Sequence, residues 1–453
     1  MKKFLSLILA LAMVLSLAAC GEKTPSDDGQ KDGPTEIIMW SNWGGATGEC
    51  LQAIADEFNA AQTDYFLNLT YAGSYEEIKA KVMAATAGSR PDLFCTSTEH
   101  AYYYFDNPET YVPLQGFVDA DKWDVSDLMA NLVSCYSSAD GELLCAPLGN
   151  TVVGCWYNID MLKAAGVDPK TDLASLEEIA VACDKLQAAG IKTPFYVQAN
   201  TIYYTFPLTA EGLHYVDNNN GKDGLPTKDV ISEEPTKSVT NKYWDLYISM
   251  AKKGQFASMD LAWNDAMTMF VNGEIALLSG TISGYNRTAV AMEAATNKFE
   301  FGFAPSYTIS KGAENHGQCV GGGCIFIGNN EDDDRARGAW EFLKYIMKSE
   351  NTVAFAKASG YLPTTVSGWN SEEYQKFVTE EFPTAVDSYN AQQATKDTCY
   401  NAWLPMFADW HQAGLDLMKD VVANPGSYTA ESATQNLIDL TNESIELYTL
   451  SKG

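Results

Sequence analysis

The chain has 453 residues, of which 46% are hydrophobic and 20% charged, so it can bury a large core and folds as a globular protein. This length exceeds what one hydrophobic core usually organises, and we therefore expect two lobes. Acidic residues outnumber lysine and arginine by 59 to 30, which gives a net charge of −29. Such a charge repels phosphate backbones and anionic lipid surfaces, which excludes nucleic acids as partners and disfavours a polyanionic ligand.

The first twenty residues are typical of an export signal followed by a lipid-attachment site. The basic pair Lys2-Lys3 precedes a short apolar run, residues 4–17, which is too short to span a bilayer comfortably. Small residues then lead to Cys20, as in bacterial lipoproteins, where the cysteine is acylated after removal of the leader, here residues 1–19. We expect a protein anchored to the cell membrane on its extracytoplasmic face, with ordinary secretion as the alternative.

Residues 21–35 show no apolar periodicity and are rich in Gly, Pro, Asp and Lys. This composition cannot bury enough surface to become ordered, so we interpret residues 20–35 as the lipidated cysteine with a flexible tether. The folded body is expected to begin at Glu36. No later segment has eighteen uninterrupted apolar residues, so no other part is expected to cross a membrane.

From Glu36 onward, short apolar strands alternate with amphipathic helices. The first elements predicted are strand 36–40, helix 49–60, strand 66–71, helix 75–87 and strand 91–95. This alternation predicts an α/β fold with a parallel sheet. Ligands bind beyond the carboxyl ends of strands in such sheets, so we expect the loops starting at Trp40, Tyr71 and Cys95 to form a binding rim.

The same alternation continues along the remaining chain. Further strands are predicted at 152–157, 275–278, 299–304 and 324–327, and further helices at 176–189, 244–252, 262–272 and 335–347. We expect the acidic run 332–334 to cap the last of these helices rather than to bind a cation. The asparagine-rich stretch 217–224 lacks the spacing of an EF-hand and predicts a solvent-exposed loop.

Ten cysteines are present, and the anchor uses one of them. Cys135 and Cys145 flank a turn, and Cys319 and Cys324 flank three glycines, so either pair is a candidate disulfide in an exported protein. Buried free thiols are the alternative, because a sequence does not show the geometry of a bridge. The absence of a Cys-x-x-Cys pair and the wide spacing of the four histidines predict no metal site, and no cofactor is expected.

Four motifs, in this order and spacing, together resemble one protein family. They are YAGSYE (71–76), APLGNT (146–151) followed by WYN (156–158) and LKAAGVDP (162–169), FVNGEIAL (270–277), and GGG (321–323) paired with GYLP (360–363). On these motifs the chain is identified as a member of the solute-binding proteins of carbohydrate ABC importers, extracellular solute-binding family 1. Within that family it most resembles the glycerol-3-phosphate-binding branch, over residues 36–450.

The resemblance implies a type II periplasmic-binding-protein fold with two α/β lobes that close on a ligand by a hinge. Lobe 1 would comprise residues 36–148 and 321–375, and lobe 2 residues 149–320 and 376–453. Crossing segments would lie near 146–151, near 319–322 and after Tyr361. The implied function is capture of a small carbohydrate by a monomer and its delivery to the permease subunits of an ABC importer.

Sugars present hydroxyl groups and flat apolar faces, so a sugar site needs aromatic platforms and planar polar groups. Trp40 and Trp43 end the first strand and are candidate platforms, although Trp40 is equally suited to the core. Family motifs assign further ligand contacts to Tyr75, Glu99, Thr151, Thr281, Gly321, Gly322 and Tyr361.

One position departs from the glycerol-3-phosphate-binding branch, which has an arginine near its C-terminal crossing that would grip the phosphate. Tyr400 stands at that place here, and residues 398–409 contain no lysine or arginine. Tyr400 and Trp403 suit stacking against a sugar, so we expect a neutral mono- or oligosaccharide. Because Arg287 and Lys396 remain as sources of charge, glycerol-3-phosphate or a phosphodiester is the alternative ligand.

Two other classes of function are considered. An exported glycoside hydrolase needs two carboxylates that flank one bond, and no recognised arrangement of this kind, nucleophile elbow or phosphate-binding loop occurs in the sequence. We therefore expect no catalytic activity. A chemosensory or adhesion lipoprotein of the same fold is the second alternative, because fold alone does not fix function.

Overall fold

The computed structural model describes residues 33–197, 206–317, 321–396, 399 and 401–452. Cys20, Cys319 and Tyr400, together with the leader and nearly all of the tether, lie outside these described residues. Residues from Thr35 onward form one compact unit. Among its helices in the described ranges, none is long and apolar enough to cross a membrane.

The first sheet has the strand order β2-β1-β3-β10-β4, with β5 paired to β10. The strands are β1 (Thr35–Ser41), β2 (Tyr65–Tyr71), β3 (Leu93–Ser97), β4 (Tyr111–Val112), β5 (Ala146–Pro147) and β10 (Gly323–Gly328). β1, β2 and β3 are parallel, which confirms the prediction from their alternation with helices. β10 runs antiparallel to β3, β4 and β5, an orientation that the sequence pattern does not indicate.

Helices cover this sheet. α2 (Gly45–Ala61) packs its Leu51, Ile54, Ala55 and Phe58 inward, as their helical spacing predicts. The other helices nearby are α3 (Tyr75–Ala84), α4 (Thr98–Phe105), α14 (Asp333–Ile346) and α15 (Ser349–Ser359). The Asp332 carboxylate accepts hydrogen bonds from the backbone N–H groups of Asp334 and Arg335, so the predicted helix cap is confirmed.

The second sheet has the order β7-β8-β6-β9. Its strands are β6 (Val153–Asn158), β7 (Phe195–Tyr196), β8 (Leu277–Thr281) and β9 (Phe301–Pro305). β6 is antiparallel to both β8 and β9, whereas β7 is parallel to β8. The larger helices beside it are α8 (Leu176–Ala188), α11 (Thr236–Lys252), α12 (Trp263–Val271) and α13 (Tyr285–Ala294).

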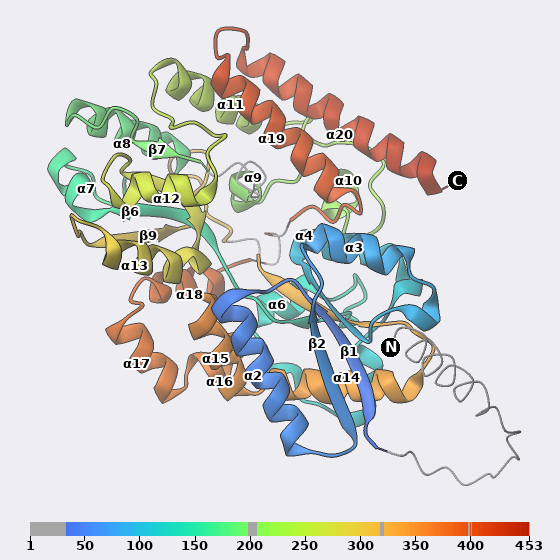
Figure 1. The fold of residues 1–453 in the computed structure, drawn as a ribbon. Helices are drawn as coiled ribbons and strands as arrows, with labels where there is room; N and C mark the ends of the chain where they lie inside the picture. Colours follow the sequence, from blue (N-terminus) through green and yellow to red (C-terminus); the bar gives the residue numbers. More distant parts are fainter. Residues whose placement is uncertain (1–32, 198–205, 318–320, 397–398, 400, 453) are drawn as a thin grey trace, which may run out of the picture. The chain divides into compact units, whose positions relative to one another are not determined.

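Three C-terminal helices complete the arrangement: α18 (Ala385–Gln393), α19 (Phe407–Ala423) and α20 (Ala430–Lys452). α19 and α20 lie beside each other and against α11, as the red and olive ribbons in Figure 1 show. α19 also contacts α4, so one helix reaches the neighbourhoods of both sheets. The shorter helices are α5 (Gln115–Asp121), α6 (Ala130–Cys135), α7 (Ile159–Ala165), α9 (Phe206–Ala210), α10 (Asp217–Asn220), α16 (Val366–Trp369) and α17 (Glu372–Glu380).

The stretch predicted as a solvent loop, residues 217–224, is only partly exposed. Asn218 and Asn219 have φ values of 52° and 54°, which asparagine tolerates better than most residues. Asn220 is fully buried, and its side chain accepts a hydrogen bond from the backbone N–H of Tyr215. The prediction of a wholly exposed loop is wrong at this asparagine, because its amide is used inside the fold.

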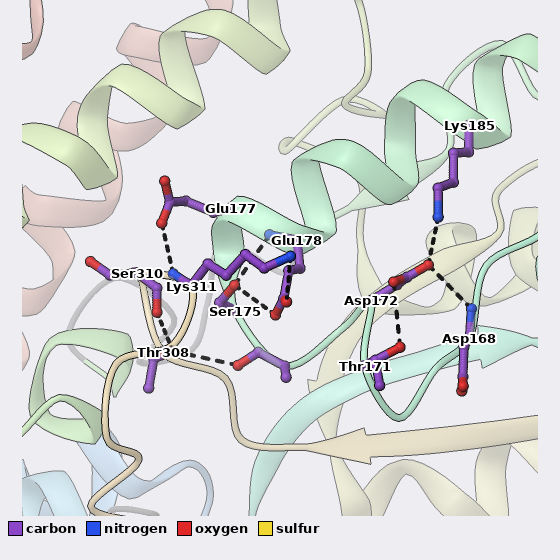
Figure 2. A network of polar contacts seen from close by, with 11 residues as sticks. Asp168, Thr171, Asp172, Ser175, Glu177, Glu178, Lys185, Thr308, Ser310 and Lys311 are labelled. Carbon is purple, nitrogen blue, oxygen red and sulfur yellow. Dashed lines mark hydrogen bonds and ion pairs between the residues drawn. The ribbon is translucent and has the colours of Figure 1, made fainter.

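A polar network ties the segment after β9 to the start of α8 (Figure 2). Ser175 caps α8 by accepting the backbone N–H of Glu178, and the carboxylate of Glu177 accepts the backbone N–H of Lys311 at 2.7 Å. A further ion pair joins Lys185 to Asp172 at 2.7 Å. These contacts fasten the segment after β9 and the loop before α8 to α8.

Seven of the eight described cysteines are buried, and no disulfide joins any two of the eight. Cys135 and Cys145 therefore do not form the disulfide that their flanking turn suggested, and the alternative of buried thiols holds for them. Burial raises the pKa of Cys145 and of Cys324, so both thiols stay protonated and unreactive at neutral pH.

Candidate ligand-binding site

A cavity of about 400 Å³ lies where the two sheets and α19 approach each other, a volume within the usual range of small-molecule pockets. Seven residues predicted from the family motifs line it, contributed by separate segments of the chain. They are Tyr75, Glu99, Thr151, Thr281, Gly321, Gly322 and Tyr361. The remaining lining residues are Glu76, Ser97, His100, Val153, Ser283, Phe407, Ala408, His411, Gln412 and Leu415.

Glu99 reaches the cavity from the first turn of α4, directly after the carboxyl end of β3. The Ser97 hydroxyl fixes this turn, because it accepts the backbone N–H of His100 at 3.3 Å and contacts the ring Nδ1 of His100 at 2.8 Å. Burial raises the pKa of the Glu99 carboxyl, while hydrogen bonds from its own backbone and from Ser97 oppose the rise. A carboxylate here accepts hydroxyl hydrogen bonds strongly.

Tyr75 is the first residue of α3, and a capping box formed by Ser74 and Glu77 sets the direction of this helix. The ring of Trp43 packs edge-on against Tyr75 and also edge-on against Phe355, with the latter centroids 5.5 Å apart. Burial raises the pKa of the Tyr75 phenol well above its ordinary value. The phenol therefore remains a hydrogen-bond donor at physiological pH.

Thr151 and Gly321 join the two sheets beside the cavity. Their backbones exchange hydrogen bonds, with N to O distances of 3.1 Å and 3.4 Å. The Thr151 hydroxyl also accepts the backbone N–H of Ser283 at 3.3 Å, and Ser283 contacts the Thr281 hydroxyl at 2.8 Å. These hydroxyl groups form one continuous polar wall.

Gly322 has a φ of 129°, and a Cβ at this position would lie 2.5 Å from the carbonyl oxygen of Gly149. Only glycine allows this backbone conformation and this close approach. At Gly321 a Cβ would come no closer than 3.1 Å, to a methyl group of Thr151. The two glycines thus differ in their steric requirement.

Tyr361 follows the C-cap of α15, where Gly360 has a left-handed φ of 78°. Its ring stacks nearly parallel to Phe355 at 6.3 Å, and burial raises the pKa of its phenol to about 12. The next residue, Leu362, donates its backbone N–H to the carbonyl of Asn150 at 2.8 Å. This hydrogen bond ties the crossing segment predicted after Tyr361 to the one predicted near residues 146–151.

One face of α19 lines the cavity, although the sequence reasoning assigned it no role. Phe407, His411 and Leu415 recur every fourth residue, and Ala408 and Gln412 lie beside them. The rings of Phe407 and His411 stack, with centroids 5.3 Å apart and planes 14° from parallel. The four-residue period of residues 407–415 is the signal that indicates this face.

Three predicted tryptophans lie outside the residues that line this cavity. Trp40 is partly buried in β1, opposite Phe94 of β3, and packs against the hydrophobic core. Trp43 stands behind Tyr75. Trp403 is only 9% exposed and stacks on Tyr102, with centroids 5.6 Å apart.

The charge of the cavity is neutral to acidic. Glu76 and Glu99 are its carboxyl groups, and none of its described lining residues is a lysine or arginine. Burial lowers the pKa of His100, against the opposing effect of Glu76, whose carboxylate lies 3.7 Å away. Across the described residues, no group of three or more His, Cys, Asp or Glu is placed to hold a metal ion.

Comparisons with known proteins agree on the family. The family model for a bacterial extracellular solute-binding protein matches residues 53–384. The sn-glycerol-3-phosphate-binding periplasmic protein UgpB of Yersinia pestis is 27% identical over 354 residues, covering 76% of this chain and 77% of the relative. UgpB of Salmonella typhimurium is 26% identical over 372 residues, covering 81% of each chain.

Solved structures show the same fold. The cyclic alpha-maltosyl-1,6-maltose binding protein from Arthrobacter globiformis superposes with a TM-score of 0.72 at 17% identity, covering 92% of this chain and all of that one. UgpB from Mycobacterium tuberculosis, in complex with glycerophosphocholine, gives 0.72 at 20% identity with the same coverage. The predicted two-lobed type II fold is thereby confirmed, and the chain belongs to the bacterial extracellular solute-binding proteins, which capture small solutes for ABC importers.

Proposed function

We propose that this protein captures a small neutral carbohydrate and delivers it to the permease subunits of an ABC importer. The observation that carries the proposal is the chemistry of the 400 Å³ cavity. Hydroxyl groups, two carboxyl groups and aromatic rings surround it, and its described lining contains no lysine or arginine. Hydroxyl-rich ligands need such mixed donors and acceptors, whereas a phosphate ester needs cations.

Tyr75, Glu99, Thr151 and Thr281 would bind ligand hydroxyls. The backbone N–H of Gly322 would add a donor, and Gly321, whose own N–H donates to Thr151, would line the site. Tyr361 and the face of α19 around Phe407 would supply apolar contact. The stacking role expected of Trp403 and Tyr400 stays a prediction, because Trp403 lies outside the cavity lining and Tyr400 outside the described residues. Trp40 and Trp43 would support this site from behind.

A thermal-shift titration of the purified protein tests the proposal, because a ligand that binds only the folded state raises the melting temperature. The panel contains neutral mono-, di- and trisaccharides of glucose, galactose, mannose and xylose, with glycerol-3-phosphate as the charged comparison. A shift with a neutral sugar supports the proposal. A shift with glycerol-3-phosphate alone contradicts it.

Glycerol-3-phosphate or a phosphodiester is the second candidate ligand. The UgpB relatives favour it, and so does Arg287, whose charge acts on the Tyr361 phenol and lowers its pKa against the effect of burial. Arg287 is exposed and has no ion-pair partner among the described residues. In contrast, Lys396 pairs with Glu314, so it is not free to hold a phosphate.

We also propose that the two sheets are the centres of two lobes, 36–148 with 321–375 and 149–320 with 376–453, that close on the ligand as a hinge. Strand order supports this division, because β5 belongs to the first sheet and β6 to the second, and β9 and β10 divide likewise. Binding without catalysis is the expected activity. Incubation of the protein with chromogenic glycosides tests this expectation, and release of the coloured product would contradict it.

The location that we propose is the outer face of the cell membrane, with acylated Cys20 as the anchor and the folded part as a monomer. The leader pattern and the family both support an extracytoplasmic protein. Replacement of Cys20 by serine tests the anchor, since it should move the protein from the membrane fraction to the soluble fraction. An unchanged distribution would contradict lipidation.

A further inference from the structure

A second, smaller cavity of about 120 Å³ lies between α6, α18 and the chain around Asn401. Asn131, Gln392 and Asn401 contribute carboxamide groups to its lining. One water molecule needs about 10–15 Å³ of such space, so the cavity admits a much larger group. Its volume lies below the range of independent ligand pockets, about 300–1,000 Å³, which suits an extension of a larger site.

Five polar atoms of these carboxamides are buried without hydrogen-bond partners in the described part of the chain. Gln392 and Asn401 are each 2% exposed. The side-chain oxygen and nitrogen of Asn401, both amide atoms of Asn131 and the oxygen of Gln392 lack hydrogen-bond partners within the described part of the chain. A buried polar atom left unpaired costs about 1–3 kcal/mol. Five such atoms in one cavity therefore indicate a polar occupant.

A direct contact connects this cavity to the ligand site. The Gln392 amide nitrogen donates to the side-chain oxygen of Asn150 at 2.6 Å and to the backbone oxygen of Thr151 at 3.4 Å. Thr151 lines the larger cavity. The smaller cavity therefore adjoins the crossing segment at which the predicted ligand contacts gather.

The chemistry of the smaller cavity points to an uncharged, hydroxyl-rich group. A carboxamide both donates and accepts, which matches a hydroxyl that also does both. Unpaired amide oxygens disfavour an anion, and the only lysine of its described lining, Lys396, is already paired with Glu314. Sugar hydroxyls reproduce the hydrogen bonds of any water that they displace.

Resting on the proposed function, we infer that Asn131, Gln392 and Asn401 form a second subsite, which holds one further sugar unit of an oligosaccharide. The ligand is then at least a disaccharide. The two Asn side chains contact the added unit, while Gln392 also fixes the crossing segment through Asn150.

The first experiment measures the affinity of the purified protein for each neutral mono-, di- and trisaccharide of glucose, galactose, mannose and xylose by titration calorimetry. We expect at least one disaccharide to bind about tenfold more tightly than its monosaccharide, because it gains several hydrogen bonds. Asn401→Leu should abolish this difference and leave the monosaccharide affinity unchanged. Lys185→Met, in the remote network of Figure 2, is the control and should change neither.

The second experiment needs no ligand. If the amides serve a ligand rather than the fold, replacing them by leucine of similar shape removes unpaired polar atoms and raises the melting temperature of the unliganded protein. Lower melting temperatures for both Asn131→Leu and Asn401→Leu would overturn the inference, because the amides would then be satisfied within the fold. Equal mono- and disaccharide affinities would also overturn it but leave the proposed function intact. Failure of every sugar to bind would overturn both.

Discussion

The indole of Trp43 packs edge-on against the phenol of Tyr75, with ring centroids 6.2 Å apart and planes at 88°. Trp43 does not line the ligand cavity, whereas Tyr75 does. We therefore expect Trp43 to affect ligand binding through the position of Tyr75. This arrangement separates the aromatic residues that support the site from those expected to touch the ligand.

We predict that Trp43→Ala lowers sugar affinity about tenfold, because an aromatic pair contributes about 0.5–1.5 kcal/mol beyond burial and Tyr75 loses its support. Trp43→Phe should restore most of that affinity. Calorimetric titration of both variants, of Tyr75→Ala and of the double alanine variant forms a double-mutant cycle. Additive losses would show that Trp43 acts independently of Tyr75 and would contradict the prediction.

Glu99 is predicted to make stability depend on pH. Burial raises its pKa above the ordinary value of 4.5. A group whose pKa is raised in the folded state stabilises the fold fully at pH values below its unfolded-state pKa. This stabilisation is lost as the pH rises through the folded-state pKa. At pH 7 the buried carboxylate therefore opposes folding, and Glu99→Gln should raise the melting temperature of the unliganded protein at pH 7 but not at pH 4.

The same substitution should weaken sugar binding about tenfold at pH 7, since a neutral amide is a poorer acceptor than a carboxylate. Glu57→Gln is the control, because Glu57 is exposed on α2 and lies outside the cavity lining, so its replacement should leave the melting temperature and the affinity unchanged. A lower melting temperature for Glu99→Gln at pH 7 would show that the carboxylate stabilises the fold.

Gly322 and Gly321 are predicted to respond differently to alanine. Gly322→Ala forces a side chain into a left-handed conformation and against Gly149, and we expect a loss of about 1–3 kcal/mol in the free energy of unfolding. Gly321→Ala requires only a small shift of Thr151 and should cost less. Urea unfolding of the two variants measures the difference, and equal losses would be inconsistent with the observed backbone at Gly322.

Binding of the proposed neutral ligand should be nearly independent of salt. Salt screens the attraction between charges, with a screening length of about 10 Å at 0.1 M ionic strength and about 3 Å at 1 M. Contacts to uncharged hydroxyl groups are not affected by this screening. We expect the dissociation constant for a sugar to change less than about twofold over this range. A decrease in affinity of an order of magnitude would instead indicate an anionic ligand held by a cation such as Arg287.

The sequence predicted most strands and helices to within a few residues, because apolar periodicity marks them clearly. It also brought together Tyr75, Glu99, Thr151 and Tyr361, since family motifs specify these positions at strand and helix ends. It could not separate Trp43 from the cavity wall, because the loop pattern around a tryptophan does not show which neighbour its ring faces.

Partners distant in the chain were the main omission. The role of His411 depends on α19 packing toward α4, and that of Gln392 on a contact with Asn150, 242 residues away. The four-residue period of residues 407–415 indicates a buried face of α19 but not the helix that it contacts, and the contact of Gln392 leaves no local pattern. Cys135 and Cys145 show the opposite case, because a local turn suggests a bridge that the fold does not form.

The position of β10 has a consequence for the order of folding. β10 lies between β3 and β4, yet it follows every strand of the second sheet in the chain. The polypeptide is synthesised from its N-terminus, so one edge of β3 stays unpaired until residues 323–328 have been made. The first sheet therefore cannot be completed early. Late, long-range pairing of this kind slows folding. A chain that folds late in this way stays unfolded for longer, and an unfolded chain is what passage through a membrane pore requires.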